Sequence, residues 1–476
     1  MIRTEFPSTT VPYPVCLVIL VMACFLVITD TAYGEAFRIQ DQSASATGQG
    51  SAFAAQADDP SAIHYNPAGM TGLERVQVSI GTNLISSHVD FKSVSGTNVN
   101  GGIDGTVANP PPSNFFLTAN LKDLGFEAFG DLSLGIGLTS PYGIQVKYSE
   151  SSQLGQLNSF AALPLIDIKP TIAYKVNQYL SLGAGLDIYT FSILGETQAE
   201  QKLTAGPEWA FPPLNGLGIT PGAKLEANGT DTAVGFNISL MLTPWRNPDL
   251  KPRLNLAFVY RNQVSLNLKG KLLVDGAEFA DASTELNLPQ IFSGGIALWP
   301  IRDNKKEWKV EVDVDYVDWT SFKNLDLELD SIASLPGARV TIPSERNYDS
   351  AVIVVFGTEY KWISPSDLPD WDIAIRGGFS HSETPVPKKT FSPSVPDADS
   401  NTLSFGAGFI CRKNGRFFTL FPCGGNWVKA IAVDLAFQTV FFETRKIRST
   451  NDPLQRVNGN WENNLYVGAL NLRLNF

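Results

Sequence analysis

Histidine is the side chain best suited to metal binding and to acid–base catalysis near neutral pH, and the sequence has only three, His64, His88 and His381. They lie in separate parts of the chain. Neither an HExxH motif nor paired CxxC motifs occur, so the sequence predicts no metal site and no cofactor. The nearest approach to a hydrolase is Ser380-His381-Ser382, but adjacent strand residues point to opposite faces. We therefore predict no catalytic residues and no enzyme; a barrel hydrolase is an alternative that measured turnover of phospholipid or ester would support.

Basic residues form the second group of candidates, because a cation could pair with an anionic group of a ligand. Each lies in a segment of alternating hydrophobicity, at a position whose parity places it on the polar face. Acidic residues such as Asp167, Glu311 and Asp434 share that face and could pair with these cations instead. The sequence leaves the binding role of all four open. The candidates are Lys169, Arg253, Arg261 and Arg376.

The segments that carry these residues have the period of β-strands. In the last of them Leu470 and Leu472 alternate with Asn471 and Arg473, which gives one apolar and one polar face. A single strand of this kind would suit the wet face of a soluble sheet. About fourteen of them, ending in a terminal Phe476, instead predict an antiparallel transmembrane β-barrel, and an even number is typical of bacterial outer-membrane barrels. The segments are residues 76–91, 113–121, 132–148, 163–176, 179–196, 224–244, 253–274, 284–300, 308–329, 350–362, 371–384, 401–410, 427–442 and 464–476.

The connections between the segments alternate in length, which supports the barrel independently of the strand count. Barrels with both chain ends in the periplasm have short periplasmic turns and long extracellular loops, whereas a soluble sandwich has no reason to keep this parity. Short turns are expected at residues 177–178, 245–252, 301–306 and 363–370. Long loops are expected at residues 92–112, 197–223, 330–349, 385–400 and 443–463.

The parity of the connections places Cys411 and Cys423 in an unusually long periplasmic turn, CRKNGRFFTLFPC. Both cysteines remain after removal of the first 34 residues, and an exported protein experiences an oxidising compartment. We predict a disulfide between them that staples the turn; two unpaired thiols are the alternative.

Composition excludes several classes of protein. The chain has 476 residues, 17% of them charged, and no long apolar run after the first thirty, which excludes a bundle of membrane-spanning helices. Residues 1–34 are expected to be a signal peptide, with Arg3, an apolar core at 15–28 and the small-x-small site Ala32-Tyr33-Gly34. A membrane anchor is the competing interpretation, but a span needs about 20 apolar residues. The net charge of −11 argues against a nucleic-acid partner.

Residues 35–75, the hatch segment, form the only sizeable stretch without strand alternation. Its small and polar residues would also suit a flexible linker. Asp59-Pro60 fits a helix N-cap followed by proline, and Asn66-Pro67 repeats that pattern. The ordered set resembles the N-terminal hatch of the FadL/TodX family of outer-membrane transporters for long-chain fatty acids and other hydrophobic compounds. The residues that carry the resemblance are Phe37, Gly48, Gly50, Ala52, Asp58, Asp59, Asn66, Pro67 and Ala68.

Further stretches extend this resemblance over nearly the whole chain after residue 34, and it departs at Ser400, where the resemblance leads us to expect a basic residue. The resemblance implies a plug inside the barrel formed by residues 76–476, apolar ligand pockets near the extracellular end, and an inward kink of the third strand that opens a lateral path. A strand that simply ends at Thr139 is the alternative. Residues that could supply the flexibility and the missing donor of a kink are Gly135, Gly137, Pro141 and Gly143.

One predicted extracellular loop is too apolar for an ordinary loop, and we interpret it as part of the surface where ligand enters. Self-packing of the loop, or contact with the membrane rim, is the alternative. The residues concerned are Trp209, Phe211, Leu214 and Leu217.

Together these features predict a monomeric barrel in the outer membrane of a Gram-negative bacterium, in contact with outer-membrane lipid. It would pass hydrophobic small molecules passively: long-chain fatty acids, aromatic hydrocarbons or other compounds. A non-transporting barrel, such as an adhesin or structural porin, is the alternative, and a fatty ligand that co-purifies inside the protein would argue against it.

Overall fold

The computed structural model describes residues 35–109, 111–192, 196–212, 214–332, 337–417, 420–425 and 427–476. These residues belong to one compact unit, Ala32–Phe476. The predicted signal peptide, residues 1–34, lies outside them. Within the described part of the chain, no helix is long and apolar enough to cross a membrane.

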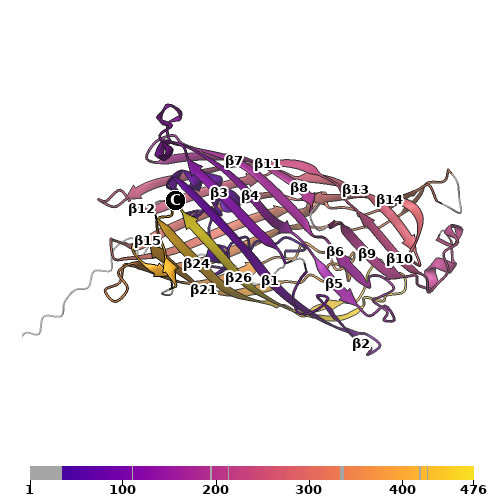
Figure 1. Ribbon diagram of the computed structural model, residues 1–476. Helices are drawn as coiled ribbons and strands as arrows, with labels where there is room; N and C mark the ends of the chain where they lie inside the picture. The colour runs from indigo at the N-terminus through magenta and orange to yellow at the C-terminus, as the bar shows by residue number, and fades with distance from the viewer. Residues whose placement is uncertain are drawn as a thin grey trace, which may run out of the picture. The chain divides into compact units, whose positions relative to one another are not determined.

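Fourteen antiparallel strands form a closed barrel, as the sequence predicted. The first strand pairs with the last, from Gln77 opposite Asn475 to Ser93 opposite Gly459, which closes the wall. Figure 1 shows the strands running obliquely along the barrel. The wall strands are β1 (Val76–Ser93), β3 (Ser113–Asn120), β4 (Leu132–Tyr142), β7 (Leu165–Lys175), β8 (Leu180–Phe191), β11 (Ala233–Arg246), β12 (Pro252–Arg261), β15 (Gln290–Arg302), β16 (Lys306–Asp318), β19 (Ser350–Ile363), β20 (Trp371–Ser382), β21 (Ser400–Arg412), β24 (Ala430–Phe442) and β26 (Gly459–Asn475).

Further elements extend the wall at the end with the long loops, which Figure 1 shows opposite the C-terminus. The strands there are β2 (Asn98–Gly102), β5 (Gln145–Tyr148), β6 (Phe160–Ala162), β9 (Ala199–Thr204), β10 (Lys224–Gly229), β13 (Val264–Val274), β14 (Ala277–Leu288), β17 (Leu327–Asp330), β18 (Val340–Ile342) and β25 (Arg445–Ile447), with 3-10 helices η4 (Pro207–Ala210), η5 (Leu214–Leu217) and η6 (Trp319–Ser321). The short-turn end carries η2 (Lys122–Leu124), η3 (Glu127–Phe129) and the hairpin of β22 (Arg416–Phe417) and β23 (Phe421–Pro422).

The two faces of the wall differ as the alternation predicted. In β26 the side chains of Leu470 and Leu472 are 47% and 40% exposed, whereas Asn471 between them is buried. In β16, Lys309 and Glu311 are buried on the inside. An outward apolar face combined with an inward charged face is stable only if lipid surrounds the barrel, because lipid keeps the outward leucines out of contact with water.

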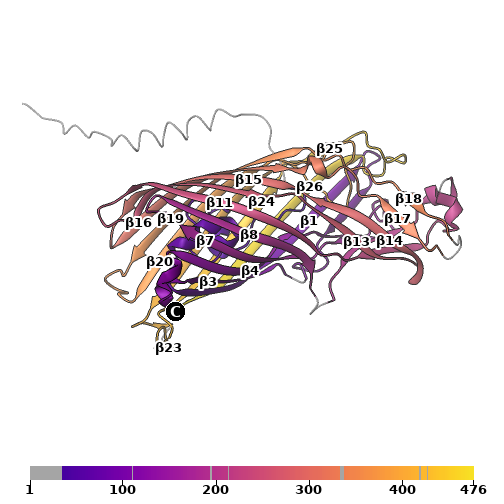
Figure 2. The same ribbon diagram turned by 90° about the horizontal axis from the view of Figure 1, so that it is seen from above.

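Three short helical turns precede β1: α2 (Ala44–Thr47), α3 (Ala62–Tyr65) and the 3-10 helix η1 (Pro67–Gly72). Asn66 caps η1 by accepting a hydrogen bond from the Ala68 amide, and Pro67 follows it as expected. The predicted cap at Asp59 is displaced, because α3 begins after Ser61, whose amide donates to the Asp59 carboxylate at 2.8 Å. Figures 1 and 2 both show these turns, in indigo, among the strands at the end where the C-terminus lies.

Candidate functional site

Two carboxylates of β16 bind the backbone of the hatch segment. The Asp313 carboxylate accepts hydrogen bonds from the amides of Phe53 and Ala54, both at 2.9 Å. The Glu311 carboxylate accepts from the amides of the next two residues, at 2.7 and 3.1 Å. Lys309 donates to Glu311 at 2.8 Å and supplies a compensating charge. Four consecutive amides of the hatch segment are thus bound by two side-chain carboxyl groups of one strand.

Glycines of the wall allow the hatch segment to approach the strands closely. A Cβ atom at Gly378 of β20 would lie 2.1 Å from the carbonyl carbon of Gln49. A Cβ atom at Gly183 of β8 would lie 2.5 Å from the backbone nitrogen of Ala68. Backbone atoms cannot move aside cheaply, so any larger residue would displace the segment. Gly357 and Gly406 also face the backbone of the segment, whereas Gly135 and Gly137 face its side chains.

The predicted hatch residues lie mostly in buried positions against the wall. Asp58 differs, because it is exposed and accepts a hydrogen bond from Gln56 at 3.1 Å. Asp59 accepts from the Ser45 hydroxyl and lies 3.7 Å from the Arg473 guanidinium. The buried residues are Phe37, Gly48, Gly50, Asp59, Asn66, Pro67 and Ala68.

The third wall strand, β4, has a break in its pairing with β7 between Thr139 and Tyr142. There it pairs with the start of the hatch segment instead: Ile39 donates to the Pro141 carbonyl at 2.8 Å, and Gly143 donates to the Phe37 carbonyl at 2.9 Å. Pro141 and Gly143 therefore lie at the break. Gly135 and Gly137 do not. They sit in regular ladders with β3 and β7 and face the side chains of the hatch segment, so their small size serves close packing.

The four candidate cations lie in the barrel wall, and each already has protein partners. Lys169 donates to Asp167 at 2.6 Å and also contacts Asp187. Arg376 is 2.7 Å from both Glu359 and Asp434. The other two make contacts to carbonyls: Arg261 donates to the His64 carbonyl, and Arg253 donates to the Pro300 carbonyl at 3.0 Å. These cations therefore stabilise the wall and its contact with the hatch segment.

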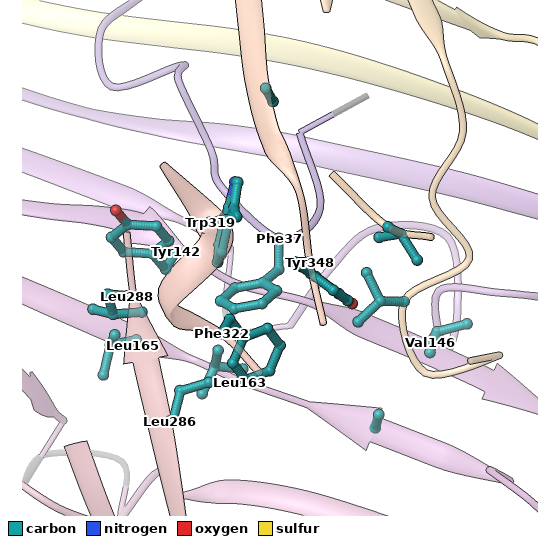
Figure 3. Close-up of a cluster of buried hydrophobic side chains, with 14 of the residues drawn as sticks. Phe37, Tyr142, Val146, Leu163, Leu165, Leu286, Leu288, Trp319, Phe322 and Tyr348 are labelled. Atoms are coloured by element: carbon teal, nitrogen blue, oxygen red, sulfur yellow. The ribbon is translucent and has the colours of Figure 1, made fainter. Parts of the chain in front are cut away.

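An apolar cavity of about 170 Å³ lies at the long-loop end of the barrel. Its walls come from β6, β9, β10, β13, β14 and β17, and Phe37 of the hatch segment lines it together with Phe322. Figure 3 shows Phe37 beside Trp319, Phe322 and Tyr348. The ring centroids of Phe37 and Trp319 are 4.7 Å apart in an edge-on arrangement. None of the four candidate cations is among the described residues that line this cavity.

The apolar loop folds on itself. Trp209 and Leu217 are buried in a cluster with residues of β10, β13, β14 and β17, which corresponds to the self-packing alternative. Leu214 packs against this cluster, and Phe211 is 64% exposed. Of the four residues proposed for the surface where ligand enters, Phe211 alone projects from the loop.

Cys411 and Cys423 form a disulfide in the structure, with their Cα atoms 5.7 Å apart, and the bridge encloses the β22–β23 hairpin.

We predict that alkylation of the mature protein without reductant modifies neither Cys411 nor Cys423, and that both react after reduction, because the oxidised pair offers no thiol. Intact-mass measurement checks this. Modification of both residues before reduction would contradict the bridge.

Sequence reasoning missed two features of the site. Alternation places Glu311 and Asp313 on the polar face of β16, but it does not identify them as acceptors for the hatch segment, because backbone amides leave no signal in a sequence. The sequence alone assigns Gly135 and Gly137 to a kink of the third strand and indicates no packing role for the other wall glycines. Their position on the inward face of strands would have indicated close approach by another part of the chain.

Comparison with known proteins agrees with this architecture. The family model described as outer membrane protein transport protein (OMPP1/FadL/TodX) matches residues 25–476. The long-chain fatty acid transport protein of Salmonella typhi is 22% identical over 410 residues, covering 82% of this chain and 87% of that protein.

Solved structures agree in fold. A Pseudomonas aeruginosa FadL homologue superposes with a TM-score of 0.67 at 18% identity, covering 93% of this chain and 100% of its own. The Ralstonia pickettii toluene transporter TbuX has a TM-score of 0.64 at 16% identity, covering 91% and 98%. The closed fourteen-stranded barrel and the match over nearly the whole sequence lead to one conclusion: this chain belongs to the OMPP1/FadL/TodX family of outer-membrane transport proteins.

Proposed function

We propose that the chain takes up hydrophobic small molecules passively, long-chain fatty acids or other hydrophobic compounds, from the extracellular side. In this proposal residues 1–34 are removed as a signal peptide and residues 35–75 act as the plug. Relatives of similar length are named for fatty acids and for toluene, which is the range of cargo that the proposal covers.

The apolar cavity is the observation that carries the proposal. A water-filled pore would leave the apolar part of the ligand in contact with water, which is unfavourable by about 25 cal/mol per Å² of apolar surface. An apolar cavity removes that contact while the ligand passes the polar outer leaflet. The cavity lies at the long-loop end, which is extracellular in outer-membrane barrels, so it is placed to receive ligand first.

The hatch segment blocks the way onward from the cavity. Phe37 lines the cavity, and the residues that follow it pair with β4 at its break. Movement of this N-terminal stretch would free Pro141 and Gly143 at the same time as it enlarges the cavity. We propose that ligand leaves sideways at this break in the third strand, into the membrane, and does not cross the whole barrel.

Filling the cavity tests the proposal. Ala161 of β6 is a buried residue of the cavity wall, and Ala161→Phe would occupy space that ligand needs. We expect wild-type protein in detergent micelles to bind oleate or oleyl alcohol, and the variant to bind both at least about tenfold more weakly, as expected when about 1.4 kcal/mol of apolar contact is lost. Quenching of tryptophan fluorescence measures the affinities.

Leu435→Phe is the matched control, because it enlarges an apolar side chain on the lipid-facing side of β24, where Leu435 is 45% exposed. Its affinities should equal those of the wild type. Wild-type protein that binds neither probe would reject the uptake proposal.

A further inference from the structure

The turn between β3 and β4, residues 121–131, exposes large apolar side chains at the short-turn end of the barrel. Residues 122–129 are all exposed, and they include Phe126 at 54%, Phe129 at 57% and Leu124 at 37%. The turn between β15 and β16 at the same end is polar instead, with the sequence DNK at residues 303–305. Several large apolar side chains that share one turn are unfavourable in water, so they indicate a neighbour other than water.

The β3–β4 turn is held in one conformation. Each of its two 3-10 helices, η2 and η3, is followed by a glycine with positive φ, which allows the chain to reverse. Lys122 pairs with Asp131 at 2.6 Å across the turn. The Asp123 carboxylate accepts a hydrogen bond from the amide of Arg75, the residue before β1, at 2.9 Å. The apolar side chains are therefore presented by a fixed turn that is fastened to the wall.

The apolar surface of the turn continues the lipid-facing side of the wall. Leu134 of β4 and its partner Ile172 of β7 are 42% and 46% exposed. The pair next to the turn is Leu132 opposite Tyr174, and Tyr174 is also 46% exposed. A Cβ atom at Gly130 would lie 3.4 Å from the Tyr174 hydroxyl oxygen, so the turn contacts the wall there. The turn thus begins where the outward apolar face of β4 and β7 ends.

Exposed aromatic residues mark the edge of the lipid-facing band at this end of the barrel. Tyr174, Tyr179 and Trp245 are 46%, 51% and 41% exposed, at or beside the short-turn ends of β7, β8 and β11. Outer-membrane barrels carry such girdles at the membrane interface. Figure 1 shows the β3–β4 turn as a small purple coil that stands out sideways from the wall near the C-terminus. A turn that leaves the wall sideways at this level lies in the interface of the periplasmic leaflet.

We propose that the β3–β4 turn anchors the barrel in the periplasmic leaflet of the outer membrane, with Phe126 and Phe129 inserted among the acyl chains of phospholipids. Phospholipid is the occupant because the turn extends an apolar surface that lipid covers on the wall. The charged residues of the turn remain at the level of the head groups, as in other interfacial segments. The inference does not depend on the cargo and goes beyond the proposed uptake function.

The anchor has a consequence for the third wall strand. The turn leads directly into β4, whose pairing with β7 breaks near the other end of the strand, between Thr139 and Tyr142. Insertion of the two rings would hold the periplasmic end of β4 at a fixed depth in the membrane. The break would then keep a fixed height relative to the bilayer.

Fluorescent labels on single cysteines test the proposal in phosphatidylcholine vesicles whose acyl chains carry bromine, a quencher, near the head group. Cys411 and Cys423 form a disulfide and take no label. We expect bromine to quench labels at Phe126→Cys and Phe129→Cys at least about threefold more strongly than a label at Lys305→Cys in the polar turn. A label at Ile172→Cys reports full contact with lipid, and both turn labels should reach at least about half of its quenching.

A label at Ala128→Cys reports on the turn with both phenylalanines in place, because Ala128 is exposed between them. Its quenching should fall at least about twofold when Phe126→Ser and Phe129→Ser are added, since the rings provide the apolar contact. Unchanged quenching would show that the rings do not insert.

Three further results would overturn the anchor. Turn labels quenched no more than the Lys305→Cys label would place the turn in water or against another protein. Quenching that weakens as the ratio of protein to lipid rises would show that a second copy of the chain covers the turn. Strong quenching only by bromine at the chain ends would place the rings in the bilayer centre and not at the interface. Phe126→Cys and Phe129→Cys each give the answer alone, so one variant suffices if the other does not fold.

Discussion

Replacing both carboxylates that bind the hatch segment, Glu311→Ala with Asp313→Ala, is expected to open the barrel to ions. Four backbone amides lose their acceptors, at about 1–3 kcal/mol for each one left buried. Lys309 also loses its partner, and breaking a buried pair on one side costs about 3–5 kcal/mol. Together these losses weaken the attachment of the hatch segment to β16. We expect the mean conductance in planar bilayers to rise at least about tenfold.

The control is Glu307→Ala, which removes an acid of the same strand that pairs with Lys251 and Arg302 at the short-turn end. Its conductance should match that of the wild type. The double variant Glu311→Gln with Asp313→Asn separates the effect of the carboxylate charge from the effect of the hydrogen-bond acceptor. Its amide oxygens can still accept the hydrogen bonds, so we expect an intermediate conductance. A double alanine variant that conducts no more than wild type would show that these carboxylates do not hold the segment.

Gly378→Val is expected to displace the hatch segment by collision alone, without removing any hydrogen-bonding group. A Cβ atom there would lie within 2.4 Å of three backbone atoms of Gln49 and Gly50. A Thr47→Cys reporter, at a fully buried position, should then react with a maleimide at least about tenfold faster than in the wild-type background. Labelling rates measured by mass spectrometry check this, since the structure has Cys411 and Cys423 in a disulfide.

The neighbouring Gly377→Val provides the matched control. Its Cβ atom would meet a single side-chain atom, Thr358 Cγ2 at 3.9 Å, which is ordinary contact. Both variants add the same β-branched residue to the same strand. They differ only in the face of the strand that carries the new side chain, because the Gly378 side faces the hatch segment and the Gly377 side does not. Equal labelling rates in the two variants would contradict a tight fit at Gly378.

The barrel could be predicted from the sequence because alternation and loop parity are properties of the chain itself. In β16, the order of Lys309, Glu311 and Asp313 among valines specifies the inward face without any knowledge of neighbours. The short connections then identify the periplasmic end of the barrel, and the long connections identify the extracellular end. Each of these signals recurs at every strand, so an error in the interpretation of one segment does not change the predicted fold.

The site could be predicted only in part, because its chemistry depends on which groups meet across the barrel. Asp167 and Asp434, which the sequence analysis names as possible partners of the candidate cations, contact Lys169 and Arg376. The contacts of the same cations with Asp187 and Glu359 depend on the register between neighbouring strands, which the sequence does not give. Trp209 was interpreted as exposed because the strands that cover it are not adjacent in sequence.

The seam between β1 and β26 constrains the order in which this protein is built. β1 directly follows the hatch segment, and its whole length is bonded to the final strand of the chain. The seam cannot close until the last residues have been synthesised and inserted. The residues synthesised last thus complete the wall directly beside the strand that carries the hatch segment.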